Sequence, residues 1–416
     1  MRLGDVCSKI GSGATPKGGK EAYKSSGIPL IRSQNVLDWS FTNNGLAFID
    51  ETQATALANV EVKPCDILLN ITGDSVARAC MVPDWCTPAR VNQHVSIVRP
   101  SPALDPTFLL CFLQSSKPLL LKLASSGATR NALTKGMIGD LEIELPSIET
   151  QRAIASLIGL IQQKLALNQQ ANDYLEELVV AMFGKFYMSK WGNELPEGWS
   201  YQRVDDIAEK VAMGPFGSNI KVDTFVDEGV SIISGAHLKG LLLEESNYNH
   251  ITEEHASRLH NSMVYPGDIV FTHAGNIGQA SLITEWSNEQ RYIISQRQFY
   301  LRCDKSKLLP EIPALYFHTR IGKHVLTANS TSTGVPSIAQ PSSYLKSIEL
   351  LVPDMPSQHR FVKTIKPLLQ SIVANRNETD CLDRLRNALL PKLMSGEIDV
   401  SQVKPPTQPN NHLCAG

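Results

Sequence analysis

The chain has 416 residues, which is more than one ordinary hydrophobic core accommodates and suits roughly two or three domains. Hydrophobic residues make up 42% and charged residues 19%, which excludes a disordered chain, and no apolar run reaches the ~18 residues of a membrane span. The start contains no apolar signal core, so we expect a cytoplasmic protein. The net charge of −2 means that any binding to nucleic acid requires locally clustered cations.

An internal duplication organises the whole sequence, with a period of about two hundred residues. RLGDVCSKIGSG (2–13) matches RVDDIAEKVAMG (203–214) without a gap. Each half also ends alike, with LEIELPSIETQR (141–152) in the first and IELLVPDMPSQHR (348–360) in the second. A period this long indicates a duplicated domain followed by a duplicated helix, rather than a solenoid.

The first part of each half has the pattern of a β-rich domain. Strand–turn signals rich in Gly, Asp and Asn occur in PCDILLNITG (64–73) and, at the matching place, in PGDIVFTHAG (266–275). We therefore predict one β-rich domain over residues 1–145 and a second over residues 191–350.

A long helix is predicted after each domain, within residues 146–190 and 351–400. Apolar residues recur there in steps of four and three, which is the pattern of a coiled-coil seam. In the second copy Pro367 predicts a kink or a break. The predicted seam contains Ile154, Ile158, Ile161, Leu165, Asn168, Leu175, Leu178 and Met182, and Phe361, Ile365, Leu368, Ile372, Asn375, Leu382, Leu385 and Leu389.

Each seam carries one asparagine near its helix midpoint, Asn168 and Asn375. If the helices pair antiparallel, the two amides could face each other, and a buried Asn fixes register although it costs stability. Two solvated amides on the helix flanks explain the pattern equally well. The predicted fold class is α+β: two β-rich domains separated by two long antiparallel helices that form a coiled coil, with pseudo-twofold internal duplication.

The sequence contains no motif of a catalytic or metal centre. GSGATPKGGK (11–20) does not satisfy the phosphate-loop pattern, and no apolar strand precedes it. Neither a Gly-rich cofactor loop after a strand nor an Asn/Asp-Pro-Pro-aromatic motif of an adenine methyltransferase occurs. Asp66 and Asp268 lie at turns without a following Glu-x-Lys, which argues against a nuclease. The 8 cysteines form no C-x-x-C pair and the 10 histidines no H-E-x-x-H, so no metal site is predicted.

Polar loops stand at equivalent places in the two halves and differ in their side chains. Arg can pair with guanine and Asn or Gln with adenine, while Ser and Thr can bond several base edges. Taken singly each loop is ordinary solvated surface, but together with the duplication the loops favour recognition of double-stranded DNA. The candidate DNA-binding residues are Arg32, Ser33, Gln34, Asn35, Thr72, Arg78, Asn92, Gln93, His94, Arg130 and Asn131, and Ser234, His237, Lys239, His273, Asn276, Gln279, Gln296, Arg297 and Gln298.

These features together resemble a known family. The resemblance is carried by Leu145-Pro146 with Gln151-Arg152-Ala153-Ile154, Val352-Pro353 with Gln358-His359-Arg360-Phe361, Leu195-Pro196-Glu197-Gly198-Trp199, and LLPKLMSGEI (389–398). In this combination the sequence is similar to the specificity subunits of type I restriction-modification enzymes. The match covers nearly the whole chain and leaves residues 401–416 as a flexible tail. One departure is that no LPEGW-type segment precedes residue 2.

The resemblance implies a mechanism as well as a fold. Each β-rich domain would read one half of a bipartite, asymmetric DNA target, and the paired helices would act as a ruler for the spacer. The chain would bind no cofactor and have no catalytic residue. Two modification (methyltransferase) subunits would bring S-adenosylmethionine and methylate adenine, and restriction (motor-nuclease) subunits would add cleavage with ATP and magnesium. The specificity chain of a type IIB-like enzyme, and a scaffold that binds no DNA, remain as alternatives.

Overall fold

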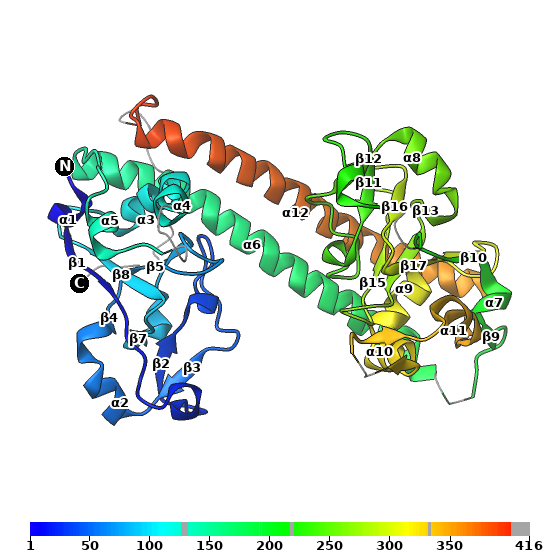
Figure 1. Ribbon diagram of the computed structural model, residues 1–416. Coiled ribbons are helices and arrows are strands. Elements are labelled where there is room, and N and C mark those ends of the chain that lie inside the picture. Colours follow the sequence, from blue (N-terminus) through cyan, green and yellow to red (C-terminus); the bar gives the residue numbers. More distant parts are fainter. Residues whose placement is uncertain (126–131, 191, 193, 217–219, 332–333, 401–416) are drawn as a thin grey trace. The chain divides into compact units, whose positions relative to one another are not determined.

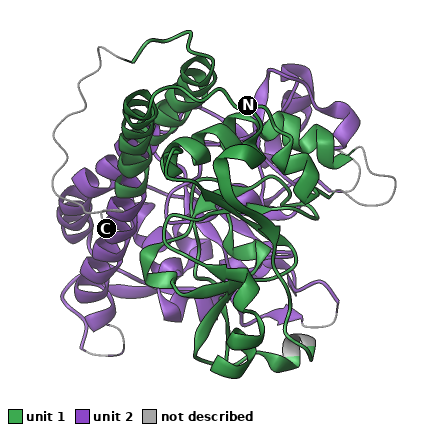
Figure 2. Ribbon diagram, turned by 90° about the vertical axis from the view of Figure 1, so that its left-hand side faces the viewer, with its two compact units in different colours: residues 1–167, 378–416 green, residues 168–377 purple. Residues whose placement is uncertain are grey.

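The computed structural model describes residues 1–125, 132–190, 192, 194–216, 220–331 and 334–400 (Figure 1). The chain forms two compact units, unit 1 with residues 1–167 and 378–416 and unit 2 with residues 168–377 (Figure 2). Helices α6 (Ile148–Phe186) and α12 (Met355–Met394) both cross from one unit to the other. Each unit therefore contains one β-rich domain and a part of both long helices. No helix of the described residues has the length and apolarity needed to cross a membrane.

Two four-stranded sheets form the β-rich part of unit 1. The first has the order β1-β8-β5-β6, with β1 (Cys7–Ser12), β8 (Val95–Pro100), β5 (Ile67–Asn70) and β6 (Ala79–Met81), and its neighbours are antiparallel. The second has the order β3-β2-β7-β4, with β3 (Ala47–Ile49), β2 (Ile28–Ile31), β7 (Ala89–Val91) and β4 (Glu61–Val62), and β2 runs parallel to β7. The shorter helices are α1 (Leu3–Val6), α2 (Glu51–Ala56), α3 (Pro106–Ser115), α4 (Lys117–Ser125) and α5 (Lys135–Gly139).

The first sheet of unit 1 separates two hydrophobic cores. Ile67 and Leu69 of β5 pack in one core with Phe108 of α3, whereas Leu68 between them packs in the other core with Leu30 of β2. Successive side chains of a strand point to opposite faces, so an apolar strand without alternation is covered on both faces. The helices cover one face of the sheet, and the second sheet covers the other.

Unit 2 repeats this architecture. Its sheets have the orders β10-β17-β14-β15 and β12-β11-β16-β13, with β10 (Ala208–Met213), β17 (Gln298–Cys303), β14 (Asp268–Thr272), β15 (Ala280–Leu282), β12 (Asn249–Ile251), β11 (Val230–Ile233), β16 (Tyr292–Ile294) and β13 (Met263–Val264). Two small pairs join β20 (Glu349–Val352) to β9 (Ser200–Arg203) and β18 (Ser330–Thr331) to β19 (Ser337–Ile338). Its other helices are α7 (Val204–Ile207), α8 (Glu253–Arg258), α9 (Glu311–His318), α10 (Arg320–Thr327) and α11 (Pro341–Ser347). The predicted α+β fold with an internal duplication is confirmed.

A buried ion pair holds the first sheet together in each unit. The carboxylate of Asp66 accepts hydrogen bonds from Nε and Nη2 of Arg99 at 2.7 and 2.8 Å. Asp268 accepts the same two bonds from Arg302 at 2.8 and 2.6 Å. Each aspartate also accepts the backbone N–H of the residue three positions earlier. The two aspartates that the sequence placed at turns thus join a turn to a neighbouring strand.

A buried glutamine fastens the start of each long helix. The side-chain oxygen of Gln151 accepts the backbone N–H of Asp105 at 2.9 Å, and its amide donates to the carbonyls of Ala103 and Pro146 at 3.1 and 3.0 Å. Gln358 makes the same three bonds to the equivalent backbone groups at 2.8, 2.9 and 2.8 Å. The spacing between the proline and the glutamine in both family motifs follows from this arrangement.

The long helices bury their predicted seam in the first half of each. Ile154, Ile158, Ile161, Phe361, Ile365 and Ile372 are buried, and Leu165 and Leu368 are half-buried. Further along, the prediction is wrong by one residue in both helices, because Leu178 and Leu385 are exposed whereas Val179 and Arg386 are buried. Helix α12 also continues without a break through Pro367, near its start.

The midpoint asparagines lie together inside unit 2. Asn168 is buried, and its amide donates to the backbone carbonyl of Asn375 at 3.4 Å. The amide of Asn375 donates at 2.9 Å to the side-chain oxygen of Asn172, a residue that fell in a polar gap of the predicted seam. Three asparagines therefore form a polar cluster between α6 and α12, and the alternative of two solvated amides is wrong.

Candidate nucleic-acid interface

In unit 1 the candidate loops are joined by hydrogen bonds at the ends of β2, β5 and β7. The buried amide of Asn70, at the end of β5, donates to the carbonyls of Ser33 and Val36 at 2.9 and 3.2 Å. The Thr72 hydroxyl lies 2.6 Å from Nδ1 of His94 in the turn between β7 and β8. Thr72 also forms a bridge to Ala132, so the segment after residue 131 meets the same place. The loops that the sequence predicted to act together are neighbours in space.

The predicted side chains of unit 1 differ in how far they are exposed to solvent. Gln34 and Gln93 are exposed, whereas Arg32, Ser33, Thr72, Arg78 and His94 are half-buried. The guanidinium of Arg32 is already engaged, because it bonds the carbonyl of Gly45 and lies over the ring of Tyr23. Arg78 makes no side-chain hydrogen bond or ion pair to a described residue, so its donors are available to a ligand. Arg130 and Asn131 lie outside the described residues.

Asn35 and Asn92 are corrections to the predicted set because both side chains are buried. The Asn35 oxygen accepts the backbone N–H of Arg32 at 3.0 Å, and its amide donates to two carbonyls of the loop at 42–44. The Asn92 oxygen accepts the backbone N–H of His94 at 3.1 Å. These amides shape the turns that carry the exposed residues and do not themselves face solvent.

In unit 2 the equivalent loops converge in the same way. The Thr272 hydroxyl donates to Oε1 of Gln279 at 3.1 Å, and the backbone N–H of His273 donates to the carbonyl of Arg297 at 3.0 Å. The backbone of His273 also accepts from Ile338, which brings strand β19 to this edge. Lys239, Asn276, Gln296 and Arg297 are exposed, and Ser234, His273 and Gln279 are half-buried. The guanidinium of Arg297 and the ammonium of Lys239 make no hydrogen bond or ion pair within the described chain.

His237 and Gln298 are the corresponding corrections in unit 2. His237 is buried, and its Nδ1 accepts the backbone N–H of Ser234 at 2.9 Å. Burial lowers the pKa of this imidazole, which keeps it neutral and able to accept. Gln298 is also buried and accepts from the hydroxyl of Ser295. His237 takes the place of Asn35: each acceptor stands three residues after the backbone N–H that it binds, and this spacing is the signal that the sequence reading missed.

The described residues contain no group of three or more His, Cys, Asp or Glu side chains that could hold a metal ion. The two loop clusters instead offer hydrogen-bond donors and acceptors on side chains that are exposed or half-buried. In unit 1 the exposed amides of Gln34 and Gln93 carry donors and acceptors, and within the chain Gln34 donates to the carbonyl of Gly45 while Gln93 bonds Thr15 and His94. In unit 2 the exposed Arg297 adds a positive charge beside Gln296. Such groups suit non-covalent recognition of base edges and phosphates.

Comparisons with known proteins find a matching family model, a similar relative and a solved structure with the same fold. Residues 1–177 match the family model described as "Type I restriction modification DNA specificity domain". The chain is 21% identical over 425 residues to the type I restriction enzyme MjaIX specificity subunit of Methanocaldococcus jannaschii, with 95% of this chain and 92% of the relative covered. The crystal structure of the type I restriction-modification system S subunit from M. genitalium shares the fold, with 13% identity, a TM-score of 0.55, and 94% of this chain and 95% of that chain covered.

Residues 1–177 therefore match the DNA specificity domain of type I restriction-modification systems. Over nearly its whole length the chain is similar to a specificity subunit of such a system, and it shares the fold of another, in agreement with the family that its sequence motifs predicted.

Proposed function

We propose that the two units read the two halves of a bipartite, asymmetric sequence in double-stranded DNA. The target-recognition domains are residues 1–145 and 191–350, and residues 146–190 and 351–400 form the spacer between them. The observation that carries this proposal is that both units build the same loop cluster and equip it with different exposed side chains. Two identical readers would require a symmetric target, whereas two different readers require an asymmetric one.

The chemistry belongs to partner subunits in this proposal. Two modification subunits bind S-adenosylmethionine and methylate one adenine in each half-site, and restriction subunits add cleavage with ATP and magnesium. The chain itself binds none of these cofactors and acts in the cytoplasm. The matched DNA specificity domain and the exposed, unpaired cations of the loop clusters support this division of labour.

A domain exchange tests the two-reader proposal. Residues 1–145 are replaced by the equivalent domain of another family member, and the chain is co-expressed with its modification subunits. Sequencing of methylated adenines should show one altered half-site and one unchanged half-site, and the matched exchange of residues 191–350 should alter the other half. A change in both halves from a single exchange would contradict the proposal.

An insertion tests the spacer. Seven residues added after Leu165 and after Ile372 keep the seam in register and lengthen each helix by ~10 Å at about 1.5 Å per residue. The spacer of the methylated sequence should grow by about three base pairs, since duplex DNA advances ~3.4 Å per pair. Activity should fall, because three pairs also rotate one half-site by roughly 100° at ~10.5 pairs per turn. An unchanged spacer with full activity would show that the helices do not set the distance.

A further inference from the structure

Helix α10 of unit 2 exposes a row of basic side chains (Figure 1). Arg320, Lys323 and His324 are exposed, whereas Gly322 and Leu326 on the opposite side of the helix are buried. Since an α-helix has 3.6 residues per turn, Arg320 lies one turn before Lys323 and His324 on the same outer face. Neither Arg320 nor Lys323 forms an ion pair or a side-chain hydrogen bond within the described part of the chain. The face therefore presents two cations that no other side chain neutralises.

The chain around α10 is free of acidic residues. Residues 191–350 contain more Asp and Glu than Lys and Arg, but residues 312–348 contain neither Asp nor Glu. The basic residues nearest to α10 in the sequence, Lys307 and Lys346, are paired with Asp304 and Asp205, which both lie outside that stretch. Helix α10 is thus a local cluster of cations in an otherwise acidic domain. Such clustering is what the binding of an anionic polymer to this chain requires.

The outer face of α10 leads directly to the loop cluster of unit 2. A side-chain carbon at Gly278, in the turn between β14 and β15, would lie 2.9 Å from the methyl carbon of Thr327, so the last turn of α10 packs against this turn. The segment that follows α10 returns to the same place, because Ser337 bridges Ala274. The candidate reading residue Gln279 belongs to this turn as well. The basic face of α10 therefore continues the surface that the candidate reading residues form.

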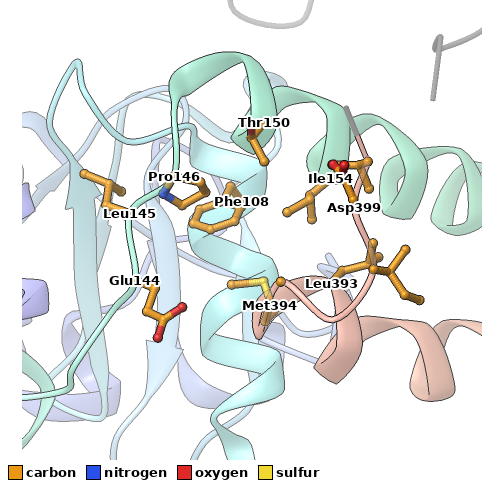
Figure 3. Close-up of a pocket in the computed structure, with 12 residues that line it drawn as sticks. Phe108, Glu144, Leu145, Pro146, Thr150, Ile154, Leu393, Met394 and Asp399 are labelled. Carbon is orange, nitrogen blue, oxygen red and sulfur yellow. The ribbon is translucent and has the colours of Figure 1, made fainter. Parts of the chain in front are cut away.

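Unit 1 holds helix α4 at the equivalent point. Ala132 bridges Thr72 by the same pairing as in unit 2, and its N–H donates at 3.3 Å to the carbonyl of Ala124 in the last turn of α4. Helix α3, which leads into α4, lies against α6, since Phe108 and Ile154 line one pocket (Figure 3). The duplication therefore keeps the position of this helix beside the loop cluster.

The exposed face of α4 differs from that of α10. Leu119 and Leu121 are exposed and make this face mainly apolar. The ammonium of Lys117 is paired with Asp38, so Lys122 is the one cation of α4 without an ion pair in the described chain. Unit 2 thus offers two unpaired cations where unit 1 offers one.

We propose that α10 binds the sugar-phosphate backbone of the DNA beside the half-site that unit 2 reads, with Arg320, Lys323 and His324 donating hydrogen bonds to phosphate oxygens. In this proposal, which rests on the function proposed above, α10 supplies affinity and orientation, and the base preference stays with the loops. Phosphate contacts fix the register of a protein on the duplex but carry no sequence information. The continuity of this face with the loop cluster favours DNA over an acidic surface of a partner protein.

The salt dependence of DNA binding tests the proposal. The full-length chain, assembled with its modification subunits, is titrated at several concentrations of NaCl with a labelled duplex that carries the methylated sequence. Arg320→Gln/Lys323→Gln should weaken binding at least about fivefold near ~0.1 M salt and lower the slope of log Kd against log salt by about two, since each phosphate contact contributes roughly 0.9. The weakening should be equal for the target and for its single-base variants. Lys122→Gln in α4 should lower the slope by no more than about one.

Two control variants separate the position of the charge from its amount. Lys305→Gln/Lys363→Gln removes the same charge from two exposed residues of unit 2, one in the turn after β17 and one on α12. It should leave the affinity and the slope unchanged, because the end of β17 that precedes Lys305 is the end remote from the loop cluster. Arg320→Lys/Lys323→Arg keeps both charges on α10 and should retain the slope of the unaltered protein.

Uncharged phosphates in the DNA locate the contact. The half-site of unit 2 is identified by the exchange of residues 191–350, and its phosphates are replaced one at a time by methylphosphonates. At the contacted phosphates the replacement should weaken binding of the unaltered complex, and it should have no further effect on Arg320→Gln/Lys323→Gln.

Three results would overturn the assignment of α10. The first is an unchanged salt slope in Arg320→Gln/Lys323→Gln, and the second is a weakening that depends on the base sequence. The third is a failure of this variant to assemble with the modification subunits in size-exclusion chromatography, which would identify α10 as a surface for an acidic partner protein. If instead the unaltered complex does not distinguish its target from single-base variants, the proposed function fails, whatever α10 contacts.

Discussion

In unit 1 the side chain of Asp66 accepts two bonds from Arg99, and in unit 2 Asp268 accepts the same two from Arg302, at nearly the same distances. The loop clusters at the other ends of the same strands differ in most of their exposed residues, although Gln93 and its equivalent Gln296 are both exposed glutamines. The difference shows where a duplicated domain can diverge. Substitution of a solvent-exposed side chain replaces one set of contacts with water by another. Substitution of one member of a buried polar pair leaves the other member without a partner.

The largest expected effect comes from breaking one ion pair. Asp268→Ala should destabilise unit 2 by about 3 kcal/mol, at the low end of the range for buried pairs because the Arg302 side chain is 20% exposed. Asp66→Ala should do the same to unit 1. Differential scanning calorimetry should show the transition of the altered unit shifted and the other unchanged. Equal shifts of both transitions from one variant would contradict the view that each pair belongs to its own unit.

The next largest loss of stability is expected from substitution of Gln151 and Gln358, which hold the starts of the long helices. Gln151→Ala and Gln358→Ala each leave one backbone N–H and two carbonyls without their partner, and we expect a loss of about 2 kcal/mol in the unit concerned. Hydrogen exchange should speed up at Asp105 in the first variant and at Leu309 in the second, because these N–H groups donate to the glutamine oxygens. The matched control is Gln→Glu, which retains the acceptor, so the N–H should stay protected.

Substitution of side chains proposed to contact DNA allows the two units to be compared by their DNA binding. Arg297→Ala should weaken binding of the assembled complex by about 1–3 kcal/mol, which is roughly 5- to 150-fold in Kd, and relax the preference at one base pair of one half-site. Arg78→Ala should act on the other half-site. Binding to a panel of single-base variants at several salt concentrations checks this. Uniform weakening across all sequences with a smaller salt slope would instead identify a phosphate contact.

A smaller effect is expected from the asparagine cluster. Asn375→Leu removes the donor to the Asn172 oxygen and should destabilise unit 2 by about 1 kcal/mol. The double variant Asn172→Leu/Asn375→Leu should recover that loss, because it removes both members of the pair. A double-mutant cycle by urea unfolding gives the coupling energy. Additive losses from the two substitutions would show that the amides do not interact.

The smallest expected effect is a loss of stability of unit 2 at mildly acidic pH. Burial lowers the pKa of His318, whose Nε2 lies 2.7 Å from the carbonyl of Ala280 and donates to it in the neutral ring. A folded-state pKa below the unfolded value of ~6.5 favours the neutral ring, so this stabilisation is present above that pH and is lost as the pH falls below it. Unit 2 should lose less than about 1 kcal/mol between pH 7 and pH 6. His318→Gln keeps a donor without the titration, and it should flatten that part of the profile measured by urea unfolding.

The sequence predicted the architecture because its signals are periodic and repeated. The strand–turn segments, the two long helices and the duplication are all present in the fold. The seam failed after Asn168 and Asn375: in α6, Val179 and Phe183 are buried in the core of unit 2 whereas Leu178 is exposed. Pro367 did not end its helix, since its position near the start limits how many backbone bonds it disturbs.

The candidate site was predictable as a set of loops but not residue by residue. Asn35 and His237 are buried, whereas Gln34 and Arg297 are exposed. Which side chain is buried depends on which backbone groups the turn leaves unpaired. The glutamines of the two family motifs were visible in the sequence, but their role was not. The backbone N–H groups that they accept lie 46 and 49 residues away in the chain, and no local pattern connects them.

The path of the chain through the two units has a consequence for synthesis on the ribosome. Unit 2 is continuous from residue 168 to residue 377, whereas unit 1 is assembled from both ends of the chain. Unit 2 can therefore finish folding first, although its residues are translated later than most of unit 1. Until the end of α12 emerges, Ile154 and Ile158 have no access to Leu390 and Leu393, with which they share a core. We expect stalled chains that end at residue 377 to contain a protease-resistant unit 2 and a protease-sensitive unit 1, so premature termination should be more harmful to the half of the protein that is made first.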